Sequence, residues 1–198
     1  TQTWAENMDL MFTFRGIPCV YYGSEVEFKK GELIDKGTLI SLENSGRAYF
    51  GDYLEGTVKA TDFSEYTASG TVADTLASPL SKHLSKVNAI RRAIPALQKG
   101  QYTASSTYVT GGDMSYVRRY TDDNTDSLAL VSISSGATFK NIPNGKYVDA
   151  VTGDVKYVTD GTLTVPELAK ANMRVYVCCA SGFTGIDGQI GGDCAYAK

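Results

Sequence analysis

The chain has 198 residues, of which 42% are hydrophobic and 21% charged, as expected for a folded protein of one large or two small domains. A formal net charge of −3 and the lack of a basic block argue against nucleic acid as a partner. No apolar run reaches the roughly 18 residues that a membrane span needs, so we expect no membrane partner either. The chain opens with Thr1 and has no charged segment followed by an apolar one, so the given sequence shows no targeting signal. A mature or truncated N-terminus would look the same.

The four cysteines do not have the spacing of a zinc site. Cys19 lies in an apolar run, and we expect it to be a small buried filler. Cys194 could form a disulfide with either Cys178 or Cys179 in an oxidising compartment, and the sequence leaves the pairing open. Thirteen Tyr and 20 Gly are typical of a secreted, β-rich protein.

The first predicted elements are a helix over residues 4–14 and a strand over residues 17–22. Thr3 is the expected N-cap, with Glu6 in the position of a capping box, and Gly16 is the expected helix stop. The strand is apolar on both faces, which is typical of a strand covered on both sides in a parallel sheet. No other strand of this kind is predicted in the chain, so the chain lacks the parallel neighbours that the strand over residues 17–22 would need.

A long polar stretch then runs from residue 26 to about residue 79, which indicates either a functional loop or a small inserted subdomain. A second helix is predicted over residues 80–94. Ser78 is its N-cap and Pro79 its first residue, while Pro95 ends it and Gly100 closes the segment.

The hydrophobic period changes to two beyond residue 101, which predicts short antiparallel strands. They are expected at residues 115–120, 128–133, 146–149, 155–158, 162–165 and 173–178, with turns at 144–145, 152–154 and 160–161. Strands and turns this closely spaced are typical of a β-sandwich. We therefore predict domains at residues 1–100 and 101–179, followed by a terminal extension or linker at 180–198.

Several segments resemble the α-amylase family of glycoside hydrolases. Residues 15–25 (R-G-I-P-C-V-Y-Y-G-S-E) resemble the family's eighth barrel strand, and residues 91–100 (R-R-A-I-P-A-L-Q-K-G) its last barrel helix. Residues 46–48 (G-R-A) resemble a segment in the loop between them, although Ser45 stands where Asn is common. Residues 147–154 resemble a hairpin of the C-terminal sandwich.

This resemblance implies an α/β region followed by an all-β region: the last βα unit of a (β/α)8 TIM barrel and an antiparallel Greek-key β-sandwich. Residues 1–100 would then be the C-terminal portion of the catalytic barrel, with helix seven, strand eight, a long loop and helix eight. The strand over residues 17–22 would be the closing strand, and its partners would precede Thr1.

The family is retaining, so it needs two carboxylates roughly 5 Å apart, and it adds a third beside a histidine. It carries these groups on strands four, five and seven, which by this resemblance would lie upstream of Thr1. We therefore expect no catalytic residue in this chain. His83 matches no catalytic histidine of the family, and we expect it on a helix surface. The resemblance allows calcium as a cofactor but assigns no ligands here.

Three residues are the candidates for substrate binding: Tyr22, Glu25 and Arg47. Tyr22 and Glu25 stand at the end of the predicted strand, where barrel folds place their sites. In the family pattern, the residue at the position of Glu25 supports the floor of the cleft. A direct catalytic role for Glu25 is the alternative. Arg47 either contacts glucan or forms a structural salt bridge.

The resemblance implies a secreted, extracellular enzyme that cleaves α-1,4-glucosidic bonds of starch or maltooligosaccharides by a retaining double displacement. The N-terminal barrel part would be a partner, and the 198 residues alone would be inactive. A non-catalytic carbohydrate-binding or structural sandwich is the alternative. It needs exposed tyrosines on one face, for which Tyr102, Tyr108, Tyr116, Tyr120 and Tyr157 are available.

Overall fold

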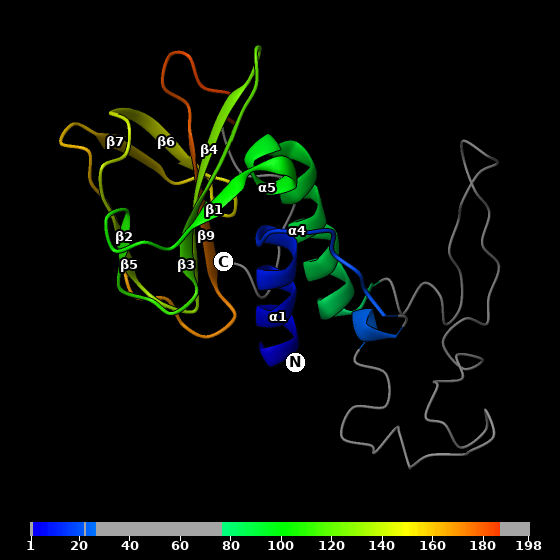
Figure 1. Ribbon diagram of the computed structural model, residues 1–198. Coiled ribbons are helices and arrows are strands. Elements are labelled where there is room, and N and C mark those ends of the chain that lie inside the picture. Colours follow the sequence, from blue (N-terminus) through cyan, green and yellow to red (C-terminus); the bar gives the residue numbers. More distant parts are fainter. Residues whose placement is uncertain (1, 22, 27–76, 187–198) are drawn as a thin grey trace, which may run out of the picture. The chain divides into compact units, whose positions relative to one another are not determined.

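The computed structural model describes residues 2–21, 23–26 and 77–186. It divides into two compact units, one formed by Thr1–Pro18 with His83–Lys198 and the other by Cys19–Lys82. The first unit holds helices α1 and α5, most of α4, and all the strands that the structure describes (Figure 1). No described helix is both long enough and apolar enough to cross a bilayer.

Helix α1 spans Gln2–Thr13, one or two residues earlier than the predicted bounds. Thr3 therefore lies inside the helix, and its expected role as N-cap is wrong. The buried face recurs at helical spacing and consists of Ala5, Met8, Asp9, Phe12 and Thr13. Gly16, at φ +98, turns the chain three residues after the helix ends, as its freedom to adopt positive φ predicts.

Helix α4 spans Pro79–Ala93, and a short helix, α5, spans Pro95–Lys99. Ser78 caps α4, since its Oγ accepts a hydrogen bond from the backbone N–H of Ser81 at 3.2 Å. Ile94 is extended before Pro95, which begins the new helix and cannot continue the old one. The predicted cap, first residue and break of this helix are confirmed.

The strands beyond residue 100 form two antiparallel sheets. The six-stranded sheet has the order β1-β3-β4-β9-β6-β7, and its strands are β1 (Gln101–Thr103), β3 (Ser115–Thr121), β4 (Asp126–Ile133), β9 (Met173–Cys178), β6 (Gly145–Asp149) and β7 (Val155–Val158). The three-stranded sheet has the order β2-β5-β8, with β2 (Val109–Thr110), β5 (Ala137–Phe139) and β8 (Leu163–Val165). The six predicted strands are confirmed, and β1, β2 and β5 were not predicted.

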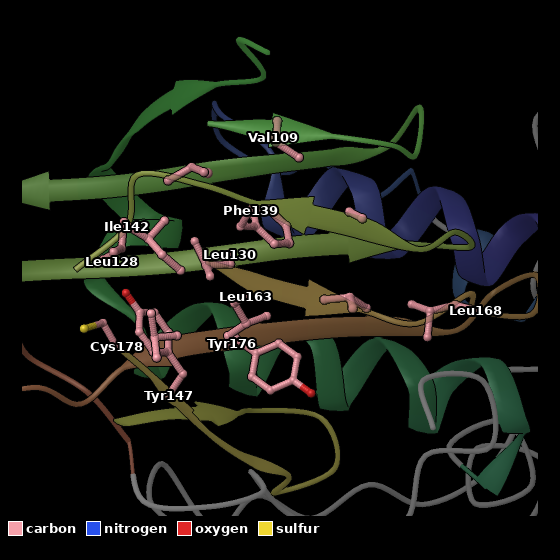
Figure 2. Close-up of a cluster of buried hydrophobic side chains, with 14 residues drawn as sticks. Val109, Leu128, Leu130, Phe139, Ile142, Tyr147, Leu163, Leu168, Tyr176 and Cys178 are labelled. Atoms are coloured by element: carbon pink, nitrogen blue, oxygen red, sulfur yellow. The ribbon is translucent and has the colours of Figure 1, made fainter. Parts of the chain in front are cut away.

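A hydrophobic core lies between the two sheets (Figure 2). Phe139 and Leu163 come from the smaller sheet, and Leu130, Tyr147 and Tyr176 from the larger. All five side chains are buried, as expected for the inner faces of two packed sheets. The architecture is thus an antiparallel β-sandwich.

Helices α1 and α5 cover the opposite face of the six-stranded sheet (Figure 1). The register places Tyr116 beside Val131, and Val131 beside Val175, on that face. All three side chains are buried. Because β4 is covered on both faces, nearly all of its residues are buried, and its sequence is apolar without strict alternation.

The predicted buried strand at residues 17–22 is wrong for this chain. Residues 17–21 pair with no described strand, and Tyr22 is not among the described residues. Ile17 is 94% exposed and Tyr21 58% exposed, and Cys19 is exposed rather than a buried filler. A strand with two apolar faces forms only with neighbouring strands that supply hydrogen bonds and cover, and no described segment does so.

Candidate functional site

The segment that carries the most specific part of the family resemblance starts where α1 ends, and Arg91 holds that start. Its guanidinium donates hydrogen bonds to the backbone oxygens of Phe12 at 2.9 Å, Phe14 at 3.3 Å and Gly16 at 2.6 Å. The Phe12 oxygen is among the last carbonyls of α1, which a helix leaves without an internal partner, and Phe14 and Gly16 lie just beyond the helix end. A cation at a helix C-terminus is also favoured by the helix dipole. Arg91 therefore fixes the direction in which residues 14–18 leave the helix.

A second arginine, Arg118 of β3, holds the same helix end from the sheet side. Its Nη1 donates to the backbone oxygen of Thr13 at 2.6 Å, and its Nη2 to that of Gly100 at 2.9 Å. Thr13 Oγ1 also lies 2.7 Å from the hydroxyl of Tyr116 on the same strand. Arg118 is buried, and this burial lowers the pKa of its guanidinium.

Aromatic rings surround this helix end. Phe14 meets the rings of Tyr102 and Tyr116 edge-on, with centroids 4.7 and 5.6 Å apart. Arg15 lies over the Phe14 ring at 5.8 Å. The junction between helix and extended segment is thus a packed structure, although Ile17, Cys19 and Tyr21, which follow it, are exposed.

Of the three predicted binding residues, the structure describes only Glu25. It lies in a short 3-10 helix, η1 (Ser24–Val26), and its side chain is partly buried. Its backbone oxygen accepts a hydrogen bond from Ser81 Oγ at 2.9 Å, which ties η1 to the first turn of α4. Tyr22 and Arg47 lie outside the described residues, so the predicted grouping of the three side chains stays a prediction.

His83 is not on a helix surface, and that expectation is wrong. It is fully buried, and its Nε2 lies 2.8 Å from Oδ1 of Asp9, which is also fully buried. Burial raises the pKa of Asp9 to about 6, against the lowering effect of His83. The sequence did hold a signal, because Asp9 stands between Met8 and Phe12 on the apolar stripe of α1.

Asp149 is another buried carboxylate, at the start of the hairpin that resembles the family. Its Oδ1 accepts from the N–H groups of Val151 at 3.2 Å and Val175 at 2.7 Å. Its Oδ2 accepts from the N–H and hydroxyl of Thr152 at 3.1 and 2.6 Å. Burial raises the pKa of Asp149 despite these bonds. The group shapes the β6–β7 turn and ties it to β9, a role in the fold rather than in chemistry.

The acidic loop between β3 and β4 is a hairpin, as predicted. Asp122 accepts a hydrogen bond from the Tyr120 hydroxyl at 2.7 Å and another from the Asn124 N–H at 2.9 Å. Asp126 pairs with Arg119 at 2.8 Å. Within the described ranges, no three His, Cys, Asp or Glu side chains gather as a metal ion would require. No described residue is therefore assigned to calcium.

The five tyrosines considered for a sugar-binding face do not share a position in the sandwich. Tyr116 is buried and Tyr102 packs against it with centroids 5.3 Å apart. Tyr157 is 74% exposed on β7, at the far edge of the six-stranded sheet. Tyr108 is 40% exposed beside the smaller sheet. These rings do not form one exposed platform.

No protein-family model matches the chain. Among solved structures, a cyclomaltodextrin glucanotransferase named CldA is 18% identical with a TM-score of 0.44, over 89% of this chain and 32% of that one. The trehalulose synthase MutB is 15% identical with a TM-score of 0.42, over 89% and 38%.

Among curated proteins, an α-amylase of Streptomyces lividans is 31% identical over 167 residues. The match covers 84% of this chain but only 17% of that protein's length. The name of this relative agrees with the family that the motifs at residues 15–25 and 147–154 resemble. The chain therefore belongs to the α-amylase family of glycoside hydrolases, of which it represents a C-terminal region.

Proposed function

We propose that these residues form the C-terminal part of an α-amylase-type enzyme that cleaves α-1,4-glucosidic bonds of starch-like glucans with retention of configuration. The observation that supports this most is the 31% identity to an α-amylase over 84% of the chain. The catalytic carboxylates would belong to the barrel strands that this region does not include. In the described part of the chain, Asp9, Asp126 and Asp149 are each engaged in contacts that hold the fold.

The proposed contribution of this chain to the site is the segment that ends in Glu25. Arg91 and Arg118 anchor the start of the segment, and the hydrogen bond from Ser81 holds its end within the second unit. Tyr22 would then offer a ring to a sugar, and Glu25 and Arg47 would hydrogen-bond sugar hydroxyls or support the groups that do. In this proposal none of the three breaks the bond.

The proposed partner is the N-terminal barrel part of the same enzyme. Ile17 and Tyr21 expose large apolar side chains on an extended segment, and neighbouring barrel strands would cover them. An enzyme acting on external starch would be secreted, which suits the abundance of Gly and Tyr in the sequence.

Two measurements test it. The 198-residue chain alone is expected to release no reducing sugar from soluble starch or maltoheptaose. A chimera in which the chain replaces the matching region of the Streptomyces lividans α-amylase is expected to be active. Glu25→Gln and Arg47→Lys in the chimera should raise KM for maltooligosaccharides more than they lower kcat. Turnover by the isolated chain, or a folded chimera without activity, would contradict the proposal.

The alternative, a non-catalytic carbohydrate-binding sandwich, makes a different prediction. In that case the isolated chain would be retained on insoluble starch, and Tyr157→Ala or Tyr108→Ala would release it. We expect no retention, because the exposed tyrosines lie apart on the two sheets.

A further inference from the structure

The chain does not leave the sandwich where β9 ends. The backbone N–H of Cys179 donates to the carbonyl of Lys146 on β6 at 2.8 Å. Further along, the N–H of Thr184 donates to the carbonyl of Asp126, the first residue of β4, at 2.7 Å. Because β4 and β6 flank β9 on its two sides, residues 179–184 cross the end of β9 from one neighbouring strand to the other.

Two apolar side chains of this crossing segment pack against the sandwich core. Ala180 and Phe183 are partly buried, and both lie against the core cluster. Cys178, which ends β9, lies at one end of that cluster with Leu128 and Tyr147 (Figure 2). Apolar side chains that cover this end remove core surface from water, which favours the folded state.

A charged pair holds Phe183 from outside the core. The guanidinium of Arg119 lies over the Phe183 ring, 5.5 Å from its centroid. The same guanidinium pairs with the carboxylate of Asp126 at 2.8 Å. Since the backbone of Asp126 also accepts from Thr184, these four residues form one connected contact at the start of β4.

Two glycines permit the path of the segment. Gly182 has φ +88, in the left-handed region that favours glycine. A Cβ at Gly185 would stand 2.7 Å from the carbonyl oxygen of Cys178 and 2.8 Å from the Cα of Cys179, so a larger residue does not fit there. The Cys179 thiol also donates to the carbonyl of Ile186 at 2.7 Å. Glycines that would be typical of a flexible linker are here required by a close approach of the backbone.

We propose that residues 179–186 form a strap that closes one end of the sandwich between β4 and β6. The sandwich domain then extends to residue 186, and a linker or extension begins only after it. Phe183 is the plug of the strap, and Gly185 is the position at which the strap meets the end of β9. A strap that cannot seat leaves the end of the core near Cys178 open, while the two sheets remain paired.

Hydrogen exchange of single amides, followed by NMR in the full-length chain, tests the strap directly. The N–H groups of Cys179 and Thr184 are both donors in the closed strap. Each should therefore exchange at least about 100-fold more slowly than in a peptide of the same sequence. Exchange of Thr184 at the rate of the peptide would overturn the proposal, because a flexible linker gives that result.

Two variants should displace the strap and leave the sheets intact. Phe183→Ala removes the plug, and Gly185→Val places a side chain against the backbone at the end of β9. Thr184 should then exchange within about tenfold of the peptide rate, whereas Leu130 in the middle of β4 should keep most of its protection. Ser181, exposed in the same segment, is the matched control, and Ser181→Ala should leave Thr184 protected. Protection of Thr184 in both variants, or its loss together with that of Leu130, would overturn the strap.

Thiol modification gives an independent measurement of the core end. Cys178 is buried in the cluster that Phe183 covers. In Gly185→Val without denaturant, a maleimide should modify Cys178 at least about tenfold faster than in the wild type. Tandem mass spectrometry distinguishes the modified Cys178 from its neighbour Cys179. Equal rates in Gly185→Val and in Ser181→Ala would show that the segment does not close the core.

Discussion

Arg118 of β3 donates a hydrogen bond to the backbone oxygen of Thr13, 2.6 Å away and 105 residues earlier in the chain. The same guanidinium reaches Gly100, where α5 meets β1. One side chain therefore connects the end of the first helix, the start of the sandwich and the face of the larger sheet. Such a contact gives α1 a defined position on the sandwich.

We predict that Arg118→Ala lowers the free energy of unfolding by about 3 kcal/mol, because the buried carbonyl of Thr13 and the partly buried carbonyl of Gly100 lose a charged donor. The neighbouring residue Arg119 is the matched control. It is exposed and pairs with Asp126 at the surface, so Arg119→Ala should cost less than about 1 kcal/mol. Urea unfolding measures both. Similar losses for the two variants would contradict the anchoring role of Arg118.

Arg91 should affect the local order of residues 14–17 more than the stability of the β-sandwich. Arg91→Gln removes the donors to Phe12, Phe14 and Gly16, so backbone amides of residues 14–17 should exchange hydrogen faster. Exchange in β4 and β9 should change little. The exposed neighbour Arg92 provides the control, and Arg92→Gln should leave both regions unchanged. Hydrogen exchange measured by mass spectrometry reads all of these segments at once.

The carboxylate of Asp149 should be required for the stability of the sandwich. Asp149→Ala leaves the N–H groups of Val151, Thr152 and Val175 without their acceptor, and a loss of about 3 kcal/mol in unfolding free energy is expected. Asp123, exposed in the β3–β4 loop, is the control, and Asp123→Ala should have an effect near zero. A shift of the denaturation midpoint equal to that of Asp123→Ala would show that the hydrogen bonds contribute nothing net.

Cysteine labelling should separate the exposed segment from the core. Cys19 is exposed on the extended segment, whereas Cys178 is buried between the sheets. A maleimide added to the native chain is expected to modify Cys19 rapidly and Cys178 only on unfolding. In the active chimera, where barrel strands would cover the segment, Cys19 should be protected. Peptide mapping identifies the modified residue. A protected Cys19 in the isolated chain would mean that the segment is already paired.

The local sequence pattern was sufficient to predict most strands of the β-sandwich. The strand at Ser115–Thr121 and the turns at Gly153 and Gly161 were predicted from a few neighbouring residues, and the structure has a strand and positive-φ glycines there. The strands that were not predicted, such as Val109–Thr110 and Ala137–Phe139, are two or three residues long. They exist because a partner strand is within reach, which no window of sequence contains.

The sequence by itself determined the family, the helix start at Pro79, the helix break at Pro95 and the six longer strands. These features depend on motifs, capping and short-range periodicity. Only the tertiary structure decided that His83 is buried against Asp9 and that Ile17 is exposed. Burial depends on what packs against a residue from distant parts of the chain. His83 meets Asp9 on a helix far earlier in the chain, while Ile17 has no described strand beside it.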